Sequence, residues 1–245
     1  MEITFLGTNG WFDTHTGSTT CVLAETENAY IIFDAGGGLY KTFDIIKDDK
    51  PVYLLLSHLH MDHIQGLQFL NIFNWKSGVK IILADEMKKE LEAIMRPPFM
   101  QTPQSHKMKV DIIPVSQAKD LPFKLEYKEL LHIVPTIGFR VQSEGKTLVY
   151  GLDSGPCANL TKLAKEADLF ITECSFLPGQ TPNKIHLNPQ QAAQTALDAN
   201  AKLMALIHFK ADDYTTLEQR DEALAAAGHI FAATFAPYDG EKFVI

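Results

Sequence analysis

The segment His58-Leu59-His60-Met61-Asp62-His63 brings three imidazoles and one carboxylate close together in the chain. In an extended backbone, residues two apart point to the same side, so His58 and His60 can bind one metal ion while Asp62 and His63 turn toward another. Imidazole and carboxylate together suit Zn²⁺, Mn²⁺ or Fe²⁺. No cysteine stands in the segment, which argues against a closed structural zinc site. The segment therefore predicts a site for two metal ions.

Apolar segments of strand length surround this motif along the whole chain. We expect strands at residues 2–6, 20–24, 30–33, 52–56, 79–83, 110–115, 123–130, 139–141, 147–150, 169–172, 203–207 and 243–245. Helical patterns fall at residues 64–73, 85–95, 159–167, 189–199 and 215–227. Asn188-Pro189 has the order of a capping residue followed by a first helical residue. Meandering strands with irregularly interposed helices favour two packed sheets with helices outside over a doubly wound parallel sheet.

Length and composition indicate the domain organisation. With 245 residues and 46% hydrophobic content, the chain can build one large α/β core, so we predict a single domain over residues 1–245. The sequence holds no apolar run of about eighteen residues and begins like a strand rather than a signal peptide. Its 3 cysteines are widely separated and imply no disulfide framework. We therefore expect a cytoplasmic protein that is not bound to a membrane.

The net charge limits the partners. A formal charge of −8 opposes non-specific binding to nucleic acid or anionic membranes, because both depend on summed lysine and arginine. Bound divalent cations would still make a strongly positive spot on an acidic surface. A small anionic substrate is therefore compatible with the composition.

The metal motif and several downstream residues together resemble the metallo-β-lactamase superfamily over nearly the whole chain. The landmarks are an aspartate after an early strand, the motif itself, a lone histidine, an aspartate after a strand and a last histidine after a strand. Here they are Asp34, the segment from His58 to His63, His132, Asp153 and His208. The resemblance implies an α/β fold, a four-layer αββα sandwich, with a dinuclear site at the sheet edge.

The resemblance also implies which residues hold the metals. One ion would take His58, His60 and His132, the other would take Asp62, His63 and His208, and Asp153 would be shared. Asp34 would orient ligands without touching a metal. The cofactors implied are two divalent transition-metal ions, zinc first, with manganese or iron as alternatives.

Within the superfamily the sequence is most similar to ribonuclease Z and the small phosphodiesterases related to it. The run His132-Ile133-Val134-Pro135-Thr136-Ile137-Gly138-Phe139-Arg140 matches the spacing of that branch. An acidic residue after a strand and a later histidine at a helix start are matched by Glu173 and His186. Two neighbouring pairs differ from ribonuclease Z, because Cys174-Ser175 stands where Ala-Thr is usual and Leu187-Asn188 where Ser-Thr is usual.

The resemblance implies a mechanism with Asp62, Glu173 and His186 as catalytic residues. A hydroxide bridging the two metals would attack the phosphorus, and the metals would neutralise charge on the phosphoryl oxygen. His186, kept protonated by Glu173, would supply a proton to the departing oxygen. Asp62 would serve as a metal ligand at the same centre.

The predicted function is hydrolysis of a small phosphodiester, with three alternatives left open. They are a ribonuclease Z-type endonuclease that removes the 3′ trailer of transfer RNA, a thioester or lactone hydrolase, and a non-catalytic scaffold. Glu173 and His186 favour diesters over thioesters, because a thiolate leaves without an acid. In ribonuclease Z a long basic arm between the lone histidine and the bridging aspartate grips the RNA. Only residues 133–152 separate His132 from Asp153 here, so we expect no extended RNA substrate.

One irregular stretch begins at Arg96 and ends at His106. Its prolines prevent a helix or a central strand. It could be a lid, a dimer contact or an ordinary surface loop, and the sequence does not separate these. A homodimer is an expectation of the family resemblance alone.

Overall fold

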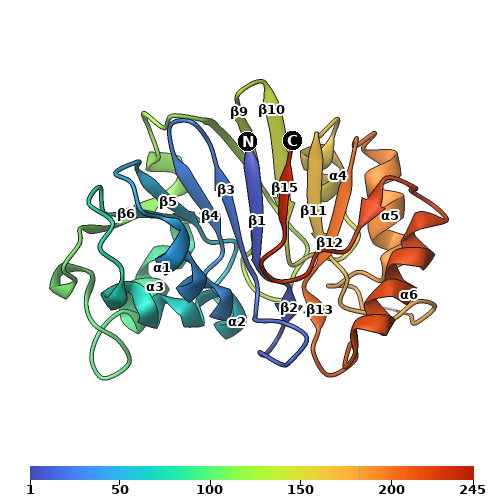
Figure 1. Ribbon diagram of the computed structural model, residues 1–245, viewed down its shortest axis with the longest axis horizontal. Helices are drawn as coiled ribbons and strands as arrows, with labels where there is room; N and C mark the ends of the chain where they lie inside the picture. Colours follow the sequence, from blue (N-terminus) through green and yellow to red (C-terminus); the bar gives the residue numbers. More distant parts are fainter. Residues whose placement is uncertain (182) are drawn as a thin grey trace.

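The computed structural model of the protein describes residues 1–181 and 183–245. Two sheets face each other at its centre, with helices on both outer sides (Figure 1). The first sheet has seven strands in the order β15-β1-β3-β4-β5-β6-β7, and the second has six in the order β14-β12-β11-β10-β9-β8. This is the expected four-layer αββα sandwich.

The strands of the first sheet are β1 (Glu2–Gly7), β3 (Cys21–Glu25), β4 (Tyr30–Phe33), β5 (Val52–Leu55), β6 (Val79–Leu83), β7 (Val110–Pro114) and β15 (Lys242–Val244). Those of the second are β8 (Lys124–Glu129), β9 (Ile137–Ser143), β10 (Lys146–Gly151), β11 (Leu169–Glu173), β12 (Met204–Ile207) and β14 (Thr234–Phe235). Strands β4 to β7 are parallel to one another, as are β10, β11 and β12. Their carboxyl ends therefore lie at common sheet edges.

The helices are α1 (Thr42–Ile45), α2 (Met61–Ile64), α3 (Lys88–Ile94), α4 (Ala158–Ala164), α5 (Pro189–Asp198) and α6 (Leu217–Gly228). Helices α1 to α3 lie beside the first sheet and α4 to α6 beside the second (Figure 1). Short 3₁₀ helices span Gly37–Lys41, Gln65–Ile72, Asp85–Met87, Pro103–Ser105 and Val115–Gln117. Among the described residues, no helix is long and apolar enough to cross a membrane.

Aromatic side chains join the two sheets close to the edge where the metal motif lies. The rings of Phe33 on β4 and Tyr150 on β10 stack at 5.0 Å, and Phe139 on β9 lies 6.4 Å from Phe33. All of these side chains are fully buried. A second apolar cluster fills the space between the second sheet and helices α4 to α6. Burial on both faces explains why the central strands β11 and β12 of this sheet are almost continuously apolar.

The start of α5 is confirmed in detail. The side chain of Asn188 accepts a hydrogen bond from the backbone N–H of Gln191, whose side chain accepts one from the Asn188 backbone N–H. This reciprocal capping box fixes the chain direction directly after His186.

Two expectations need correction. The helix expected at residues 64–73 is instead the single turn α2 followed by the 3₁₀ helix Gln65–Ile72, so helical geometry begins inside the metal motif. The two-residue strands β2 (Asn9–Gly10), β13 (Phe209–Lys210) and β14 were not expected; β2 and β13 pair with each other beside the site, and β14 pairs with β12. Two-residue strands have no periodicity for a sequence pattern to reveal, and these form only because distant segments meet.

Candidate metal centre and active site

The candidate site lies where strands of both sheets end. The metal motif follows β5 and Asp34 follows β4 in the first sheet, while Asp153 and His208 come after β10 and β12 in the second. Asp34 and His208 have left-handed φ angles of 55° and 54°. Non-glycine residues adopt such angles rarely, and those that do cluster at functional sites.

The first group of candidate ligands is His58, His60, His132 and Asp153, whose ligand atoms lie within 4.8 Å of one another. His60 Nδ1 is 3.0 Å from His58 Nε2 and 3.3 Å from His132 Nε2. Ligands bound at 2.0–2.1 Å to one tetrahedral zinc ion would be separated by about 3.3 Å. The spacing of these nitrogens therefore fits a metal ion at their centre.

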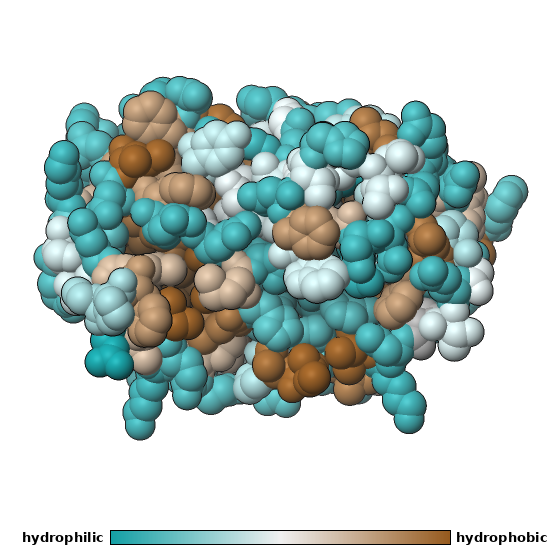
Figure 2. All heavy atoms as spheres, turned by 90° about the horizontal axis from the view of Figure 1, so that it is seen from below, coloured by the Kyte–Doolittle hydropathy of each residue, from teal (hydrophilic) through white to brown (hydrophobic). Residues whose placement is uncertain are grey.

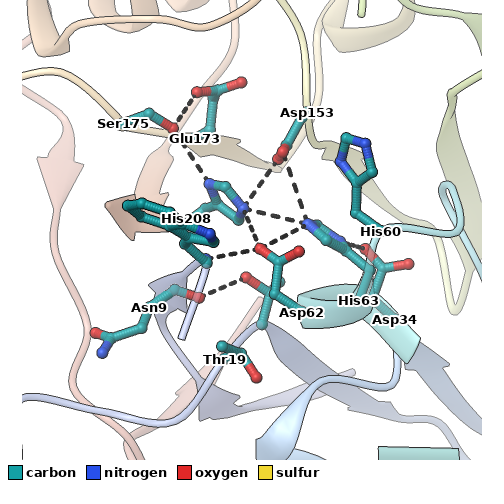
Figure 3. Close-up of polar contacts among 12 residues, drawn as sticks. Asn9, Thr19, Asp34, His60, Asp62, His63, Asp153, Glu173, Ser175 and His208 are labelled. Atoms are coloured by element: carbon teal, nitrogen blue, oxygen red, sulfur yellow. Dashed lines mark hydrogen bonds and ion pairs between the residues drawn. The ribbon is translucent and has the colours of Figure 1, made fainter. Parts of the chain in front are cut away.

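The second group is Asp62, His63 and His208, again within 4.8 Å. Figure 3 shows these side chains pointing toward one another and toward Asp153. His208 Nε2 lies 3.2 Å from His63 Nε2 and 3.3 Å from Asp62 Oδ2. The helical turn α2 causes this arrangement, because it turns Asp62 and His63 away from the direction of His58 and His60.

Asp153 lies between the two groups. Its Oδ2 is 4.0 Å from His58 Nε2 and 3.7 Å from His63 Nε2, and its Oδ1 is 3.2 Å from His208 Nε2. Oδ1 is buried and has no hydrogen-bond partner among the described residues. A buried carboxylate oxygen without a donor is costly unless a cation or another donor satisfies it. Asp153 thus has the position and the free lone pair of a ligand shared by two ions.

The second nitrogen of several candidate ligands is held by a protein oxygen. His63 Nδ1 lies 2.7 Å from Asp34 Oδ2, His58 Nδ1 lies 3.0 Å from Ser57 Oγ, and His208 Nδ1 lies 3.2 Å from Ser175 Oγ. Such contacts fix the ring orientation and the tautomer of a metal-binding histidine. Asp34 therefore has the orienting position expected for it.

Burial and neighbouring charges act differently on the histidines. Burial lowers the pKa of His58 well below its ordinary value, and lowers those of His60 and His132. Burial alone would also lower the pKa values of His63 and His208, but nearby carboxylates raise both. Neutral imidazole is the form that binds metal, and bound ions would replace the protons at the second group.

A hydrogen-bonded pair, Glu173 and His186, borders the metal groups. His186 Nδ1 is 3.0 Å from both carboxylate oxygens of Glu173. Glu173 is fully buried at the end of β11, whereas His186 is half-buried and lines the cavity above the site. The expected acid and its carboxylate partner are thus brought together beside the candidate ligands.

Ser175, Tyr150 and Gly10 also belong to the site, although the sequence analysis did not select them. Ser175 Oγ lies 3.2 Å from His208 Nδ1 and 2.5 Å from Glu173 Oε2, and so links a candidate ligand to the acid pair. Tyr150 donates a hydrogen bond of 2.7 Å to Asp34 Oδ2. A Cβ atom on Gly10 would lie 2.5 Å from His208 Cε1, so glycine makes room for that imidazole. A buried tyrosine on a central strand needs a hydrogen-bond partner, which was the one signal available.

The site opens into a cavity of about 620 Å³. Its described lining includes His60, Asp62, Asp153, His186 and His208 but no residue from the stretch between Arg96 and His106. That stretch instead borders a separate hollow with the 3₁₀ helix Gln65–Ile72. It is therefore not a lid over the site in this structure, which leaves a dimer contact and an ordinary surface loop as the alternatives.

Comparisons with known proteins identify the family of this chain. Residues 30–209 match the model of the "Beta-lactamase superfamily domain" family. The chain therefore belongs to the metallo-β-lactamase superfamily, a superfamily of metal-dependent hydrolases.

Two relatives indicate the branch. The "Probable metallo-hydrolase YhfI" of Bacillus subtilis is 26% identical over 85% of this chain and 87% of its own length. A ribonuclease Z of Synechocystis is also 26% identical, over 85% of this chain and 83% of its own length. These similarities place the chain near the ribonuclease Z branch.

Solved structures share the fold. The crystal structure of YhfI has a TM-score of 0.82 at 23% identity and covers 99% of this chain and 98% of that one. A diphosphatase of the PhnP family has a TM-score of 0.74 at 16% identity and covers 100% of this chain and 97% of that one. The four-layer fold is therefore shared along the whole chain.

We expect metal content to depend differently on two candidate ligands. Asp153→Ala should lower the occupancy of both ions, because Asp153 borders both groups, whereas His132→Ala should mainly release one. Elemental analysis after metal loading and desalting measures this directly, with exposed His15→Ala as a control that retains both ions. No more than one ion bound to the unaltered protein would contradict the two-ion assignment.

Proposed function

We propose that this protein is a dinuclear metal-dependent phosphodiesterase that acts on a small anionic phosphodiester. The observation that carries the proposal is the Glu173–His186 pair beside the two groups of candidate metal ligands. An alcohol leaving from a phosphodiester needs a proton, and such a pair can supply it.

Glu173 is better suited to orient His186 than to bind a metal. Its carboxylate also accepts hydrogen bonds from Ser154 N–H at 2.7 Å, the Ser175 hydroxyl at 2.5 Å and Leu187 N–H at 3.2 Å. Together with His186 these donors occupy the lone pairs of both oxygens. His186 therefore donates its Nδ1 proton to Glu173, and its other nitrogen is available to a substrate.

The electrostatics keep His186 protonated. Burial would lower the pKa of His186, but the Glu173 carboxylate outweighs it and raises the pKa to about 9. A group with a raised pKa holds its proton through neutral pH and loses it as the pH rises through that value. His186 is thus an acid near neutral pH.

The other candidate residues would hold the two metal ions. His58, His60 and His132 would hold one ion, Asp62, His63 and His208 the other, and Asp153 both. Two divalent ions so held would activate a water molecule near neutral pH and neutralise charge on the phosphoryl oxygens. Histidine and carboxylate ligands favour zinc, with manganese or iron as alternatives.

The alternatives fit less well. A thioester or lactone hydrolase on the same ligands would have little use for a buried carboxylate that keeps a histidine protonated. A ribonuclease Z-type endonuclease would need a grip on folded RNA, yet β9 and β10 are joined directly by the turn at Glu144 and Gly145. A scaffold without activity would not need the complete ligand set. Free cysteines fit the proposed cytoplasmic location.

Replacement of His186 should affect substrates according to their leaving group. His186→Ala should slow alkyl or nucleoside diesters by about a hundredfold or more, because the alkoxide then leaves without a proton. Nitrophenyl diesters should slow far less, since nitrophenolate is a good leaving group. Steady-state kinetics on both substrates, with His15→Ala as the histidine control, measure the difference.

The pH profile gives a second readout of the same acid. The basic limb should lie at or below a pH of about 9, because bound cations lower the pKa of His186 further. Glu173→Gln should move this limb to lower pH, and His186→Ala should remove it. Equal losses on both classes of diester, with metal content intact, would contradict the acid role.

Small diesters should be better substrates than transfer-RNA precursors. Folded RNA is held mainly through phosphates and shape, and a chain of charge −8 without a basic arm lacks that grip. We expect a higher kcat/KM for small diesters when both are assayed at moderate salt. Efficient, site-specific removal of the 3′ trailer would overturn this preference and favour a ribonuclease Z function.

A further inference from the structure

Trp11 is a large aromatic residue at the cavity above the site. It lines this cavity, and 60% of it is exposed. Its backbone N–H donates a hydrogen bond of 2.7 Å to Asp62 Oδ2, one of the candidate metal ligands. Its φ angle is 75°, in the left-handed region that bulky residues rarely adopt. The main chain of Trp11 therefore positions Asp62, but this contact does not require an indole side chain.

The loop that carries Trp11 is held firmly. Asn9 Nδ2 donates hydrogen bonds of 2.9 Å to Thr14 Oγ1 and to the Gly17 carbonyl oxygen. The buried guanidinium of Arg220 donates to Asn9 Oδ1 and, at 2.9 Å, to Thr8 Oγ1. The indole is thus presented to the cavity by an ordered loop, which reduces the conformational entropy lost when a ligand stacks on it.

The charge near Trp11 indicates what kind of group could stack there. Apart from histidines, Lys210 is the one basic side chain among the described residues that line the cavity. Its Nζ lies 5.5 Å from the centre of the Trp11 ring. The same Nζ is paired with Asp212 at 2.8 Å and Asp213 at 3.1 Å, so these carboxylates outweigh its charge. An additional phosphate would be disfavoured here, whereas an uncharged ring would not.

We propose that Trp11 is a specificity-determining residue that stacks on an uncharged planar ring of the substrate, such as the base of a nucleoside. This ring would belong to the ester group that remains on phosphorus after the other ester group has left, an assignment that rests on the proposed function. His186 would protonate the leaving oxygen. Trp11 is hydrogen-bonded to Asp62 in the second ligand group, and so lies near the other ester group. Stacking of a base on an aromatic side chain contributes about tenfold or more in affinity.

The chain offers a direct optical test, because it has 2 tryptophans. Trp75 is buried and stacked on Phe73 at 4.4 Å, so Trp75→Phe should leave Trp11 as a single exposed reporter. Adenosine 5′-monophosphate should quench the fluorescence of this metal-loaded variant, and ribose 5-phosphate should not. Trp11→Phe, which keeps Trp75 alone, should show no quenching with either ligand.

Binding and turnover test the side chain itself. By calorimetry on otherwise unaltered protein, Trp11→Ala should weaken adenosine 5′-monophosphate about tenfold or more and leave ribose 5-phosphate unchanged. The nitrophenyl ester of thymidine 5′-phosphate and methyl nitrophenyl phosphate share the nitrophenolate leaving group. They differ in the group that remains on phosphorus, which is thymidine in one and methyl in the other. Trp11→Ala should lower kcat/KM for the nucleoside ester much more than for the methyl ester, and Trp11→Phe should restore most of the difference. Phe99→Ala, an exposed aromatic residue outside the described lining of the cavity, is the matched control.

Exposed apolar residues elsewhere offer a competing explanation for the indole. Figure 2 shows apolar side chains on the half of the molecule that carries α1 to α3, and a second cluster at the lower edge of the view. In the first half of the chain, Tyr40, Phe43 and Ile72 are exposed. If Trp11 belonged to a self-association surface, Trp11→Ala would change the mass measured by light scattering and not the ligand affinity. That result would overturn the proposal.

Two further outcomes separate this inference from the proposed function. Equal losses on both nitrophenyl esters, or equal affinity of Trp11→Ala and unaltered protein for adenosine 5′-monophosphate, would overturn the stacking role while leaving the phosphodiesterase intact. Hydrolysis of neither ester by metal-loaded protein would count against the phosphodiesterase, and the fluorescence and calorimetric results would still decide the role of Trp11.

Discussion

The convergence of histidine nitrogens and aspartate oxygens at one sheet edge is the constraint on which the rest of the structure depends. His58, His60 and His132 direct lone pairs toward one centre and Asp62, His63 and His208 toward another, with the buried Asp153 between them. Bringing so many lone pairs together out of water is costly without cations. Binding of metal ions would therefore explain an arrangement that packing alone would not favour.

Both sheets must be in place before this site exists. Each ligand group takes two residues from the segment after β5 of the first sheet, whereas Asp153 and His208 follow β10 and β12 of the second. Beneath them, the stack of Phe33 on Tyr150 joins the sheets, and the Tyr150 hydroxyl donates to Asp34, which in turn holds His63. Core packing and ligand orientation are thus parts of one connected network.

Local patterns in the sequence were enough to predict much of this architecture. Strands with apolar side chains on both faces are easy to recognise, so most strands were predicted correctly. The spacing from His58 to His63 is local, and the structure brings these residues together with the other candidate ligands, whereas their binding of metal stays a prediction. Contacts between distant residues were not predictable in this way. Trp11 meets Asp62, and Ser175 meets His208, through backbone turns that leave no periodic signal. The helical turn within the motif was missed because a single turn is too short to show a period.

Anomalous diffraction from crystals of zinc-loaded protein tests the central claim most directly. We expect two zinc peaks per chain about 3.5–4 Å apart, with the Asp153 carboxylate between them. His58, His60 and His132 should surround one peak, and Asp62, His63 and His208 the other. A single peak, or two peaks that Asp153 does not join, would contradict it.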